Sequence, residues 1–198
     1  MLRQMALRLY LLTFAALVAL TLAPAAFARG GNIQFDGGTA YQRTQVREAL
    51  SISSFDWSVV PTRVTVHIAH GIESEATPGQ IWLDAGLLDA GRFSWGVVQH
   101  EYAHQVDFSL FTDAIRARVQ TQLGGKTWCN FTAGLAHADY GCERFASTLA
   151  WAYWPSADNC MRPQSKRDES GGMTPVAFRA LLASVLEKPA LRRLTVRA

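Results

Sequence analysis

Apolar and polar residues alternate in two short segments of the N-terminal half of the chain. In residues 63–68 every second side chain is apolar, and residues 80–84 form a similar short run after a Pro-Gly turn. Alternation with a period of two is typical of half-buried strands. We therefore expect two short strands, separated by a loop over residues 70–79. Residues 85–92, which follow the second strand, are expected to be irregular or briefly helical.

Five other segments place apolar residues at intervals of three and four, the spacing of one face of a helix. These segments are residues 39–53, 94–108, 112–123, 143–154 and 175–187. Strands therefore come early in the chain and helices late. This order predicts an α+β domain in which a small N-terminal mixed sheet packs on a mostly helical C-terminal half.

Residues suited to cap a helix stand at the first position of three of these segments and directly before the segment 175–187. They are Thr39, Ser94, Thr112 and Thr174. Such side chains bond the free backbone N–H groups of the first turn, and glycine commonly ends a helix, as we expect for Gly124. The first helix is expected to bury a stripe of four apolar side chains, namely Tyr41, Val46, Ala49 and Leu50.

The first 28 residues have a composition unlike the rest of the chain. Arg3 and Arg8 stand at the start, residues 9–22 are almost wholly apolar, and residues 26–28 read Ala-Phe-Ala. This is the pattern of a secretory signal peptide that is cleaved after Ala28. The apolar run is short of the roughly 20 residues that span a bilayer. Cleavage is therefore favoured over the alternative, an uncleaved membrane anchor.

Residues 29–198 are then expected to form a single exported domain, since about 170 residues are enough to bury a core. The whole chain carries 19 Lys and Arg against 16 Asp and Glu, and loss of Arg3 and Arg8 leaves a net charge of +1. Such a balance indicates no surface for nucleic acid. We expect no stable membrane association after cleavage, and nothing in the sequence specifies an oligomeric state.

Three cysteines, Cys129, Cys142 and Cys160, lie in the C-terminal half. In a chain that leaves the reducing cytoplasm, we expect one disulfide and one remaining thiol. The sequence leaves all three pairings open. A bridge that includes Cys142 would fix a loop next to Glu143.

The sequence His-Glu-Tyr-Ala-His at residues 100–104 lies within a predicted helix. Residues i and i+4 share one helical face, so His100 and His104 can bind a single Zn²⁺ ion. Glu101 can reach a water activated by the metal, take its proton as a general base and pass it to the leaving amine. The motif therefore predicts one zinc ion and hydrolysis of a peptide bond.

A catalytic zinc site also needs a third protein ligand and an open position. The candidates are Asp107, His137, Asp139 and Glu143. Asp107 lies one turn beyond His104, so we expect it to accept a hydrogen bond from a ligand imidazole rather than to bind the metal. Glu143 opens a helix rich in alanine and aromatic residues, where an unpaired carboxylate is costly. Glu143 is therefore favoured as the third ligand, and His137 is the next candidate.

With Glu143 as the third ligand, the chain resembles the gluzincin zinc metallopeptidases, in which a later helix supplies a glutamate to a His-Glu-x-x-His helix. The resemblance covers roughly residues 80–154. It implies a zincin-like fold in which residues 80–84 form an edge strand over the active-site helix and pair with an extended substrate. Some gluzincins carry an aspartate four residues after the third ligand. This chain has Ser147 there, so that orienting carboxylate is missing.

Hydrolysis further needs a hydrogen-bond donor for the developing oxyanion, and Tyr140, His137 and Tyr153 are candidates for this role. For each of them, packing in the core or in a loop is the favoured alternative. The sequence thus predicts a secreted zinc endopeptidase that acts on peptides or proteins. The alternative is a non-catalytic exported zinc-binding or interaction domain. In that case the metal only holds two helices together, and four protein ligands close the site.

Overall fold

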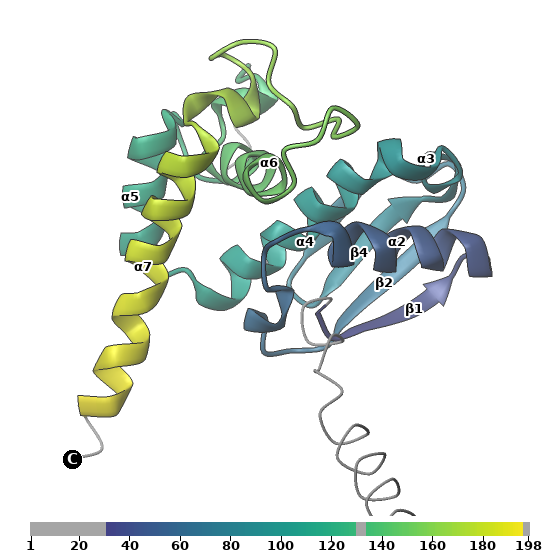
Figure 1. Cartoon of the computed structure of the whole chain (residues 1–198), viewed down its shortest axis with the longest axis horizontal. Coiled ribbons are helices and arrows are strands. Elements are labelled where there is room, and N and C mark those ends of the chain that lie inside the picture. Colours follow the sequence, from purple (N-terminus) through teal and green to yellow (C-terminus); the bar gives the residue numbers. More distant parts are fainter. Residues whose placement is uncertain (1–30, 130–133, 196–198) are drawn as a thin grey trace, which may run out of the picture.

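The computed structural model describes residues 31–129 and 134–195. These residues form a small sheet near the N-terminus and a helical C-terminal half (Figure 1). The predicted α+β class is confirmed at this level. The predicted signal peptide, residues 1–28, lies outside the described residues.

The sheet has four strands in the order β1-β2-β4-β3. The strands are β1 (Ile33–Gly37), β2 (Val64–Ala69), β3 (Glu75–Thr77) and β4 (Gln80–Asp84). β1 and β4 run parallel to β2, whereas β3 runs antiparallel to β4. The two strands predicted from alternation are therefore confirmed as β2 and β4, and they belong to a mixed sheet.

The prediction that residues 80–84 form the edge strand is wrong, because β4 lies between β2 and β3. The edge on this side is β3, which lies inside residues 70–79 and not in a loop as predicted. Three residues are too few to show an alternation, and a two-residue Pro-Gly turn folds them back onto β4. β1 is also absent from the predictions, although Ile33 and Phe35 alternate with polar residues.

Six α-helices lie in the described part of the chain. They are α2 (Ala40–Ile52), α3 (Ala85–Asp89), α4 (Trp95–Leu110), α5 (Asp113–Leu123), α6 (Gly141–Tyr153) and α7 (Pro175–Thr195). Short 3₁₀ turns are η2 (Trp57–Val59), η3 (Gly91–Ser94), η4 (His137–Asp139) and η5 (Glu169–Gly172). All five predicted helices are confirmed, and α7 continues beyond its predicted end. Within residues 31–129 and 134–195, no helix is both long and apolar enough to cross a membrane.

Threonine side chains cap helices as predicted, but Ser94 does not. Thr39 accepts a hydrogen bond from the backbone N–H of Gln42 at 3.2 Å, and the Gln42 side chain accepts one from the backbone N–H of Thr39 at 2.9 Å. Thr112 caps α5 in a similar way. The Ser94 hydroxyl instead donates to the carbonyl oxygen of Gly91 at 2.7 Å, because a 3₁₀ turn leads directly into α4.

The buried face of α2 differs from the prediction at one position. Tyr41 is 52% exposed, whereas the other three predicted residues are buried. Gln42 and Gln45 are buried beside them. Gln42 donates to Asp89 at 2.9 Å, and Gln45 accepts a hydrogen bond from the indole N–H of Trp95 at 2.8 Å. The two glutamines can line the inward face because each finds a partner for its buried amide.

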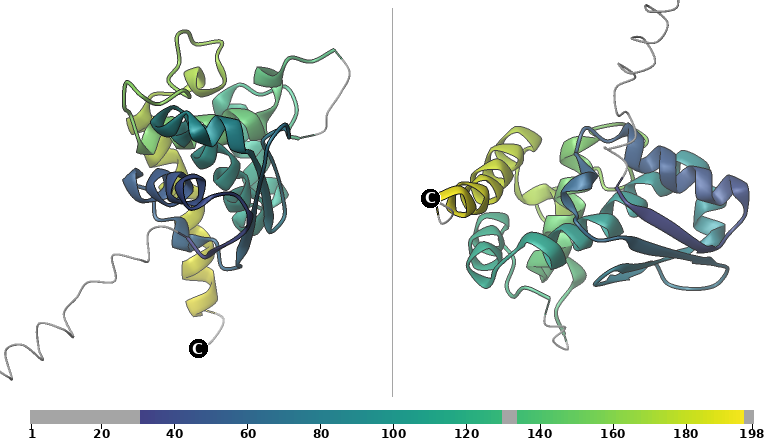
Figure 2. Two further views of the ribbon diagram at one scale, coloured as in Figure 1. Left: turned by 90° about the vertical axis from the view of Figure 1, so that its right-hand side faces the viewer. Right: turned by 90° about the horizontal axis from the view of Figure 1, so that it is seen from below.

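α2 and α4 lie on one side of the sheet (Figure 2). The buried side chains of β2 and β4 join them in one hydrophobic core. Its largest fully buried members include Trp57, Tyr102, Phe145, Phe178 and Leu50. α4 also packs against α6, so most of its residues are buried. The polar residues of α4 therefore lie inside the protein and need polar partners.

Gln105 of α4 fixes the hairpin of β3 and β4 to this helix. Its side-chain oxygen accepts a hydrogen bond from the backbone N–H of Gly79 at 2.8 Å. Its side-chain nitrogen donates to the carbonyl oxygens of Thr77 and Gln80 at 2.9 and 3.0 Å. Gly79 adopts a φ of +79°, a conformation that favours glycine. The edge strand is thereby held next to the helical turn that carries His104.

Replacing Gln105 with alanine should lower the free energy of unfolding by about 2–3 kcal/mol, because three backbone groups lose a partner that water replaces only in part. Urea unfolding followed by circular dichroism measures this loss. Gln122→Ala is the matched control, because Gln122 is an exposed glutamine on α5. A change below about 0.5 kcal/mol is expected for the control. Equal losses for both variants would show that Gln105 is not an anchor.

Candidate metal centre

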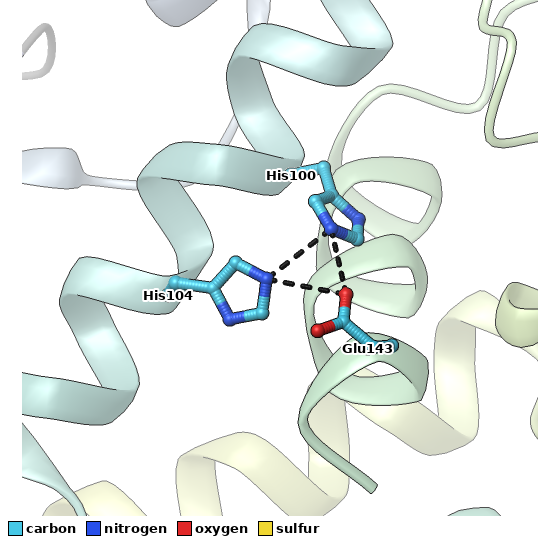
Figure 3. A group of neighbouring side chains, drawn as sticks. All are labelled: His100, His104 and Glu143. Carbon is cyan, nitrogen blue, oxygen red and sulfur yellow. Dashed lines mark hydrogen bonds and ion pairs between the residues drawn. The ribbon is translucent and has the colours of Figure 1, made fainter. Parts of the chain in front are cut away.

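Three side chains with metal-binding atoms meet where α4 packs against α6 (Figure 3). His100 and His104 lie one turn apart on α4, on the same face, as their spacing predicts. Glu143 lies in the first turn of α6 and points toward both rings. All three residues are buried, and none is more than 6% exposed. The packing of the two helices therefore brings the histidine pair and the favoured third residue together.

The distances between their donor atoms match the size of a small metal ion. The Nε2 atom of His100 lies 3.1 Å from Oε2 of Glu143 and 3.2 Å from Nε2 of His104. The Nε2 atom of His104 lies 3.4 Å from the same carboxylate oxygen. In a tetrahedral site with bonds of about 2.0–2.1 Å, the ligand atoms are about 3.3–3.4 Å apart. The three donor atoms thus fit around one ion, and the group could bind a metal.

The buried groups shift one another's ionisation. Burial by itself raises the pKa of Glu143, but the hydrogen bonds to His100 and His104 hold this pKa well below its ordinary value. Burial lowers the pKa of His100, and the contacts with Glu143 and Glu101 outweigh it, so the pKa of His100 is raised overall. Glu143 is therefore kept as a carboxylate, the form that binds a cation.

Glu101 follows His100 on α4 and is only 5% exposed. Burial raises the pKa of Glu101, and its carboxyl group also interacts electrostatically with His100, His104 and Glu143. Glu101 is not one of the three converging donors. It lies beside them, which is where the sequence motif predicts a general base.

His137 lies at the edge of the same cluster. Its Nε2 atom is 3.5 Å from Oε2 of Glu143, and its Nδ1 atom is 2.6 Å from Oε1 of Glu169. The side chain is 58% exposed. His137 is not part of the group whose donor atoms lie within 4.8 Å of one another. The geometry therefore favours Glu143 over His137 as the third ligand, in agreement with the preference from the sequence.

The two other acidic candidates have partners of their own. The sequence predicts that Asp107 accepts a hydrogen bond from a ligand imidazole, and this prediction is wrong. Asp107 accepts hydrogen bonds from Arg116 at 2.8 Å and from the indole of Trp128 at 3.0 Å. A carboxylate that is only 1% exposed needs such compensation, and a guanidinium supplies a full charge. Asp139 forms a partly exposed ion pair with Lys126 at 3.0 Å.

The two candidate tyrosines lie at opposite ends of α6. Tyr140 directly precedes the helix and is buried, and its backbone is bridged to that of Thr127. Tyr153 ends the helix, about 15 Å along the axis from Glu143 at the usual rise per residue. Its ring packs edge-on against Phe55, with ring centroids 5.0 Å apart. Tyr153 therefore belongs to the packing at the end of α6 and not to the cluster.

Glu169 is a site residue that the sequence does not reveal. Its Oε2 atom accepts a hydrogen bond from the hydroxyl of Ser147 at 2.7 Å, and this hydroxyl lies 2.9 Å from Nδ1 of His100. The Glu169 carboxylate is thus connected to the His100 imidazole through Ser147. Ser147 stands at the position where some gluzincins carry an aspartate. Glu169 comes from the polar segment of residues 156–172, and no periodic pattern marks a functional residue in such a segment.

Known proteins provide no further guide to this site. No protein-family model matches the sequence. No curated protein and no solved structure matches it either. What the site does is therefore inferred from the chemistry of its own side chains.

A disulfide joins Cys129 to Cys142 and leaves Cys160 as a free cysteine, which selects one of the three pairings that the sequence leaves open. Cys142 precedes Glu143, so the bridge ties the start of α6 to the segment after α5. Cys129, Cys142 and Glu143 also form a close group of possible ligand atoms. Sulfur atoms joined in a disulfide are not thiolates, however, and thiolates are the form that binds metals.

Replacing His100, His104 or Glu143 with alanine should weaken Zn²⁺ binding by more than about 100-fold, since even residues outside the first ligand shell contribute 10–100-fold. The His137→Ala variant should stay within about 10-fold of wild type. Competition against a chromophoric chelator measures these affinities. Loss of Zn²⁺ from His137→Ala together with its retention by Glu143→Ala would contradict the assignment of Glu143.

Replacing both Cys129 and Cys142 with serine should lower the free energy of unfolding by about 3 kcal/mol, because their sequence separation of 13 closes a loop for which this loss is typical. Urea unfolding with and without reductant checks the value. Cys160→Ser is the matched control and should remain as sensitive to reductant as wild type. A Cys160→Ser variant that is insensitive to reductant would contradict the pairing.

Proposed function

We propose that this protein is an exported zinc-dependent endopeptidase of the gluzincin type, with peptides or proteins as substrates. One observation carries the proposal: two imidazoles and a carboxylate converge on one buried point, and Glu101 lies beside them. Two histidines and a glutamate are a ligand set of catalytic zinc sites, which keep a further position open. Glu143 on α6 also supports the gluzincin pattern, in which a later helix supplies the third ligand.

In hydrolysis, the residues of the site would have different roles. His100, His104 and Glu143 would hold the metal ion, which when bound polarises a carbonyl group and lowers the pKa of water. Glu101 accepts the proton of the attacking water and gives it to the leaving amine. Burial raises the pKa of Glu101, which suits a carboxyl group that must both take up and release a proton.

His137 is the candidate for stabilising the oxyanion. Its ring contacts Glu143 and is also partly exposed, so it faces both the cluster and the solvent from which a substrate arrives. Glu169 holds the ring through Nδ1. A donor fixed in this way costs little reorganisation when negative charge develops on the substrate oxygen.

The edge strand β3 offers a surface for an extended peptide. β3 pairs with β4 on one side and forms the edge of the sheet. Gln105 ties the hairpin to α4 at the residue after His104, so this edge is held close to the metal-binding turn. A peptide that pairs with a sheet edge binds mainly through its backbone. Binding at β3 therefore fits an endopeptidase with a broad range of substrates.

Export is supported by two separate features. Residues 1–28 have the composition of a signal peptide, which would leave Arg29 as the first residue of the mature protein. The disulfide between Cys129 and Cys142 is of a kind that persists in oxidising compartments outside the cytoplasm.

Glu101→Gln should reduce the cleavage of an unfolded protein substrate by about 100- to 10,000-fold, because the substitution removes the general base. Zn²⁺ content should not change, because none of the three donor atoms is lost. The measurement combines metal analysis of the exported protein with cleavage assays in the presence and absence of a chelator. Glu48→Gln, an exposed glutamate on α2, is the matched control and should keep wild-type activity.

Two outcomes would contradict this proposal. Cleavage that survives in Glu101→Gln would defeat the role assigned to Glu101. A wild-type protein that binds Zn²⁺ and cleaves no peptide substrate would favour the alternative, a non-catalytic zinc-binding domain.

A further inference from the structure

A chain of hydrogen bonds leads from the metal cluster to Glu169. The Nδ1 atom of His100 lies 2.9 Å from the hydroxyl oxygen of Ser147, and this hydroxyl lies 2.7 Å from Oε2 of Glu169. The other carboxylate oxygen of Glu169 lies 2.6 Å from Nδ1 of His137. One carboxylate therefore contacts both the ring at the edge of the site and, through a hydroxyl, a ring of the cluster.

The direction of these hydrogen bonds follows from the single hydrogen of the Ser147 hydroxyl. Three atoms within reach could accept it: the Glu169 carboxylate at 2.7 Å, an unprotonated Nδ1 of His100 at 2.9 Å and the sulfur of Met161 at 3.4 Å. The carboxylate is nearer and charged, and charge-assisted hydrogen bonds are the stronger kind. Ser147 therefore donates to Glu169 and accepts the N–H of His100 at Nδ1.

This direction fixes the tautomer of His100. In the neutral ring, a proton held on Nδ1 leaves a lone pair on Nε2, and Nε2 is the atom that faces Glu143 and His104. An imidazole must present an unprotonated nitrogen to bind a metal. A partner on the other nitrogen both orients the ring and increases its strength as a ligand.

The backbone around Glu169 keeps its carboxylate in place. Ser170 is buried, and its hydroxyl donates to the carbonyl oxygen of Met161. Asp168 accepts hydrogen bonds from the backbone N–H groups of Gln164 and Ser165. Gly171 lies so close to the backbone at Ser165 that a Cβ atom would not fit there. Glu169 therefore extends from a segment with a defined conformation.

We infer that Glu169 is a positioning residue for the metal centre, acting on the ligand His100 through Ser147 and on His137 directly. This inference rests on the proposed zinc site and adds a residue to it. It also explains why Ser147 can stand where a carboxylate is expected. The Ser147 hydroxyl links the His100 ring to the carboxylate of Glu169, which comes from another segment.

The Zn²⁺ affinity of the protein tests this chain of hydrogen bonds without a measurement of catalysis. Glu169→Gln and Ser147→Ala should each weaken Zn²⁺ binding by about 10- to 100-fold, the usual effect of losing a partner of a metal ligand. The double variant should be no weaker than the single variants, because both substitutions break one connection. Glu48→Gln, which alters an exposed glutamate on α2, is the matched control and should bind Zn²⁺ within about threefold of wild type.

A second variant tests the chemistry rather than the fold. In Ser147→Asp combined with Glu169→Gln, the new carboxylate can accept the His100 N–H directly. About 10-fold of the lost Zn²⁺ affinity should then return, as expected for restoring a partner of a metal ligand. A rescue of this kind would not follow if Glu169 only stabilised its own segment. Thermal unfolding of each variant verifies that the affinities are compared among folded proteins.

Nuclear magnetic resonance of the wild-type protein, labelled with ¹⁵N at histidine and loaded with Zn²⁺, gives an independent reading. The proton of the zinc-bound His100 ring should lie on Nδ1. Zn²⁺ bound to Nδ1 of His100, or single variants that bind Zn²⁺ as tightly as wild type, would overturn the inference while the proposed function stands. Wild-type protein that binds no Zn²⁺ would instead remove the proposed function, and this inference with it.

Discussion

The burial of ionisable side chains between α4 and α6 is the constraint on which the rest of this structure depends. His100, His104, Glu101 and Glu143 are each at most 6% exposed. Removing a charged group from water costs several kcal/mol unless another group compensates it. Here the imidazoles and the carboxylates compensate one another, and their contacts leave three donor atoms aimed at one point. A bound cation would satisfy the same groups at once, which links the stability of this helix pair to the metal chemistry proposed for it.

α4 carries both core residues and the two histidines of the site, and this determines how precisely the metal-binding atoms are placed. Tyr102 is 1% exposed and belongs to the hydrophobic core, while His100 and His104 project toward α6 from the same turns of α4. The position of the two imidazoles is therefore fixed by the packing of α4 in the hydrophobic core beside the sheet. Sites built on packed helices are held more precisely than sites built on loops. The residues that come from outside these helices, His137 and Glu169, hold each other through a direct contact.

The sequence predicts those parts of the site that depend on local spacing. The two histidines share a helical face whatever surrounds them, and Glu143 is found because an acid in an apolar helix calls for a partner. Contacts that depend on tertiary position are not predictable in this way. Asp107 accepts a hydrogen bond from Arg116 of α5, a helix that packs against α6. Glu169 reaches the site from a segment without a periodic pattern. Likewise, β3 is too short for alternation to reveal, and its pairing displaces β4 from the edge of the sheet.

The most direct test of the central claim is a crystal structure of the Zn²⁺-loaded protein, with the metal located by its anomalous scattering. The account predicts one zinc ion bonded to Nε2 of His100, Nε2 of His104 and the carboxylate of Glu143. A fourth position should be open to solvent on the side of Glu101. Zinc bound elsewhere, or a fourth protein ligand that closes the site, would contradict the account.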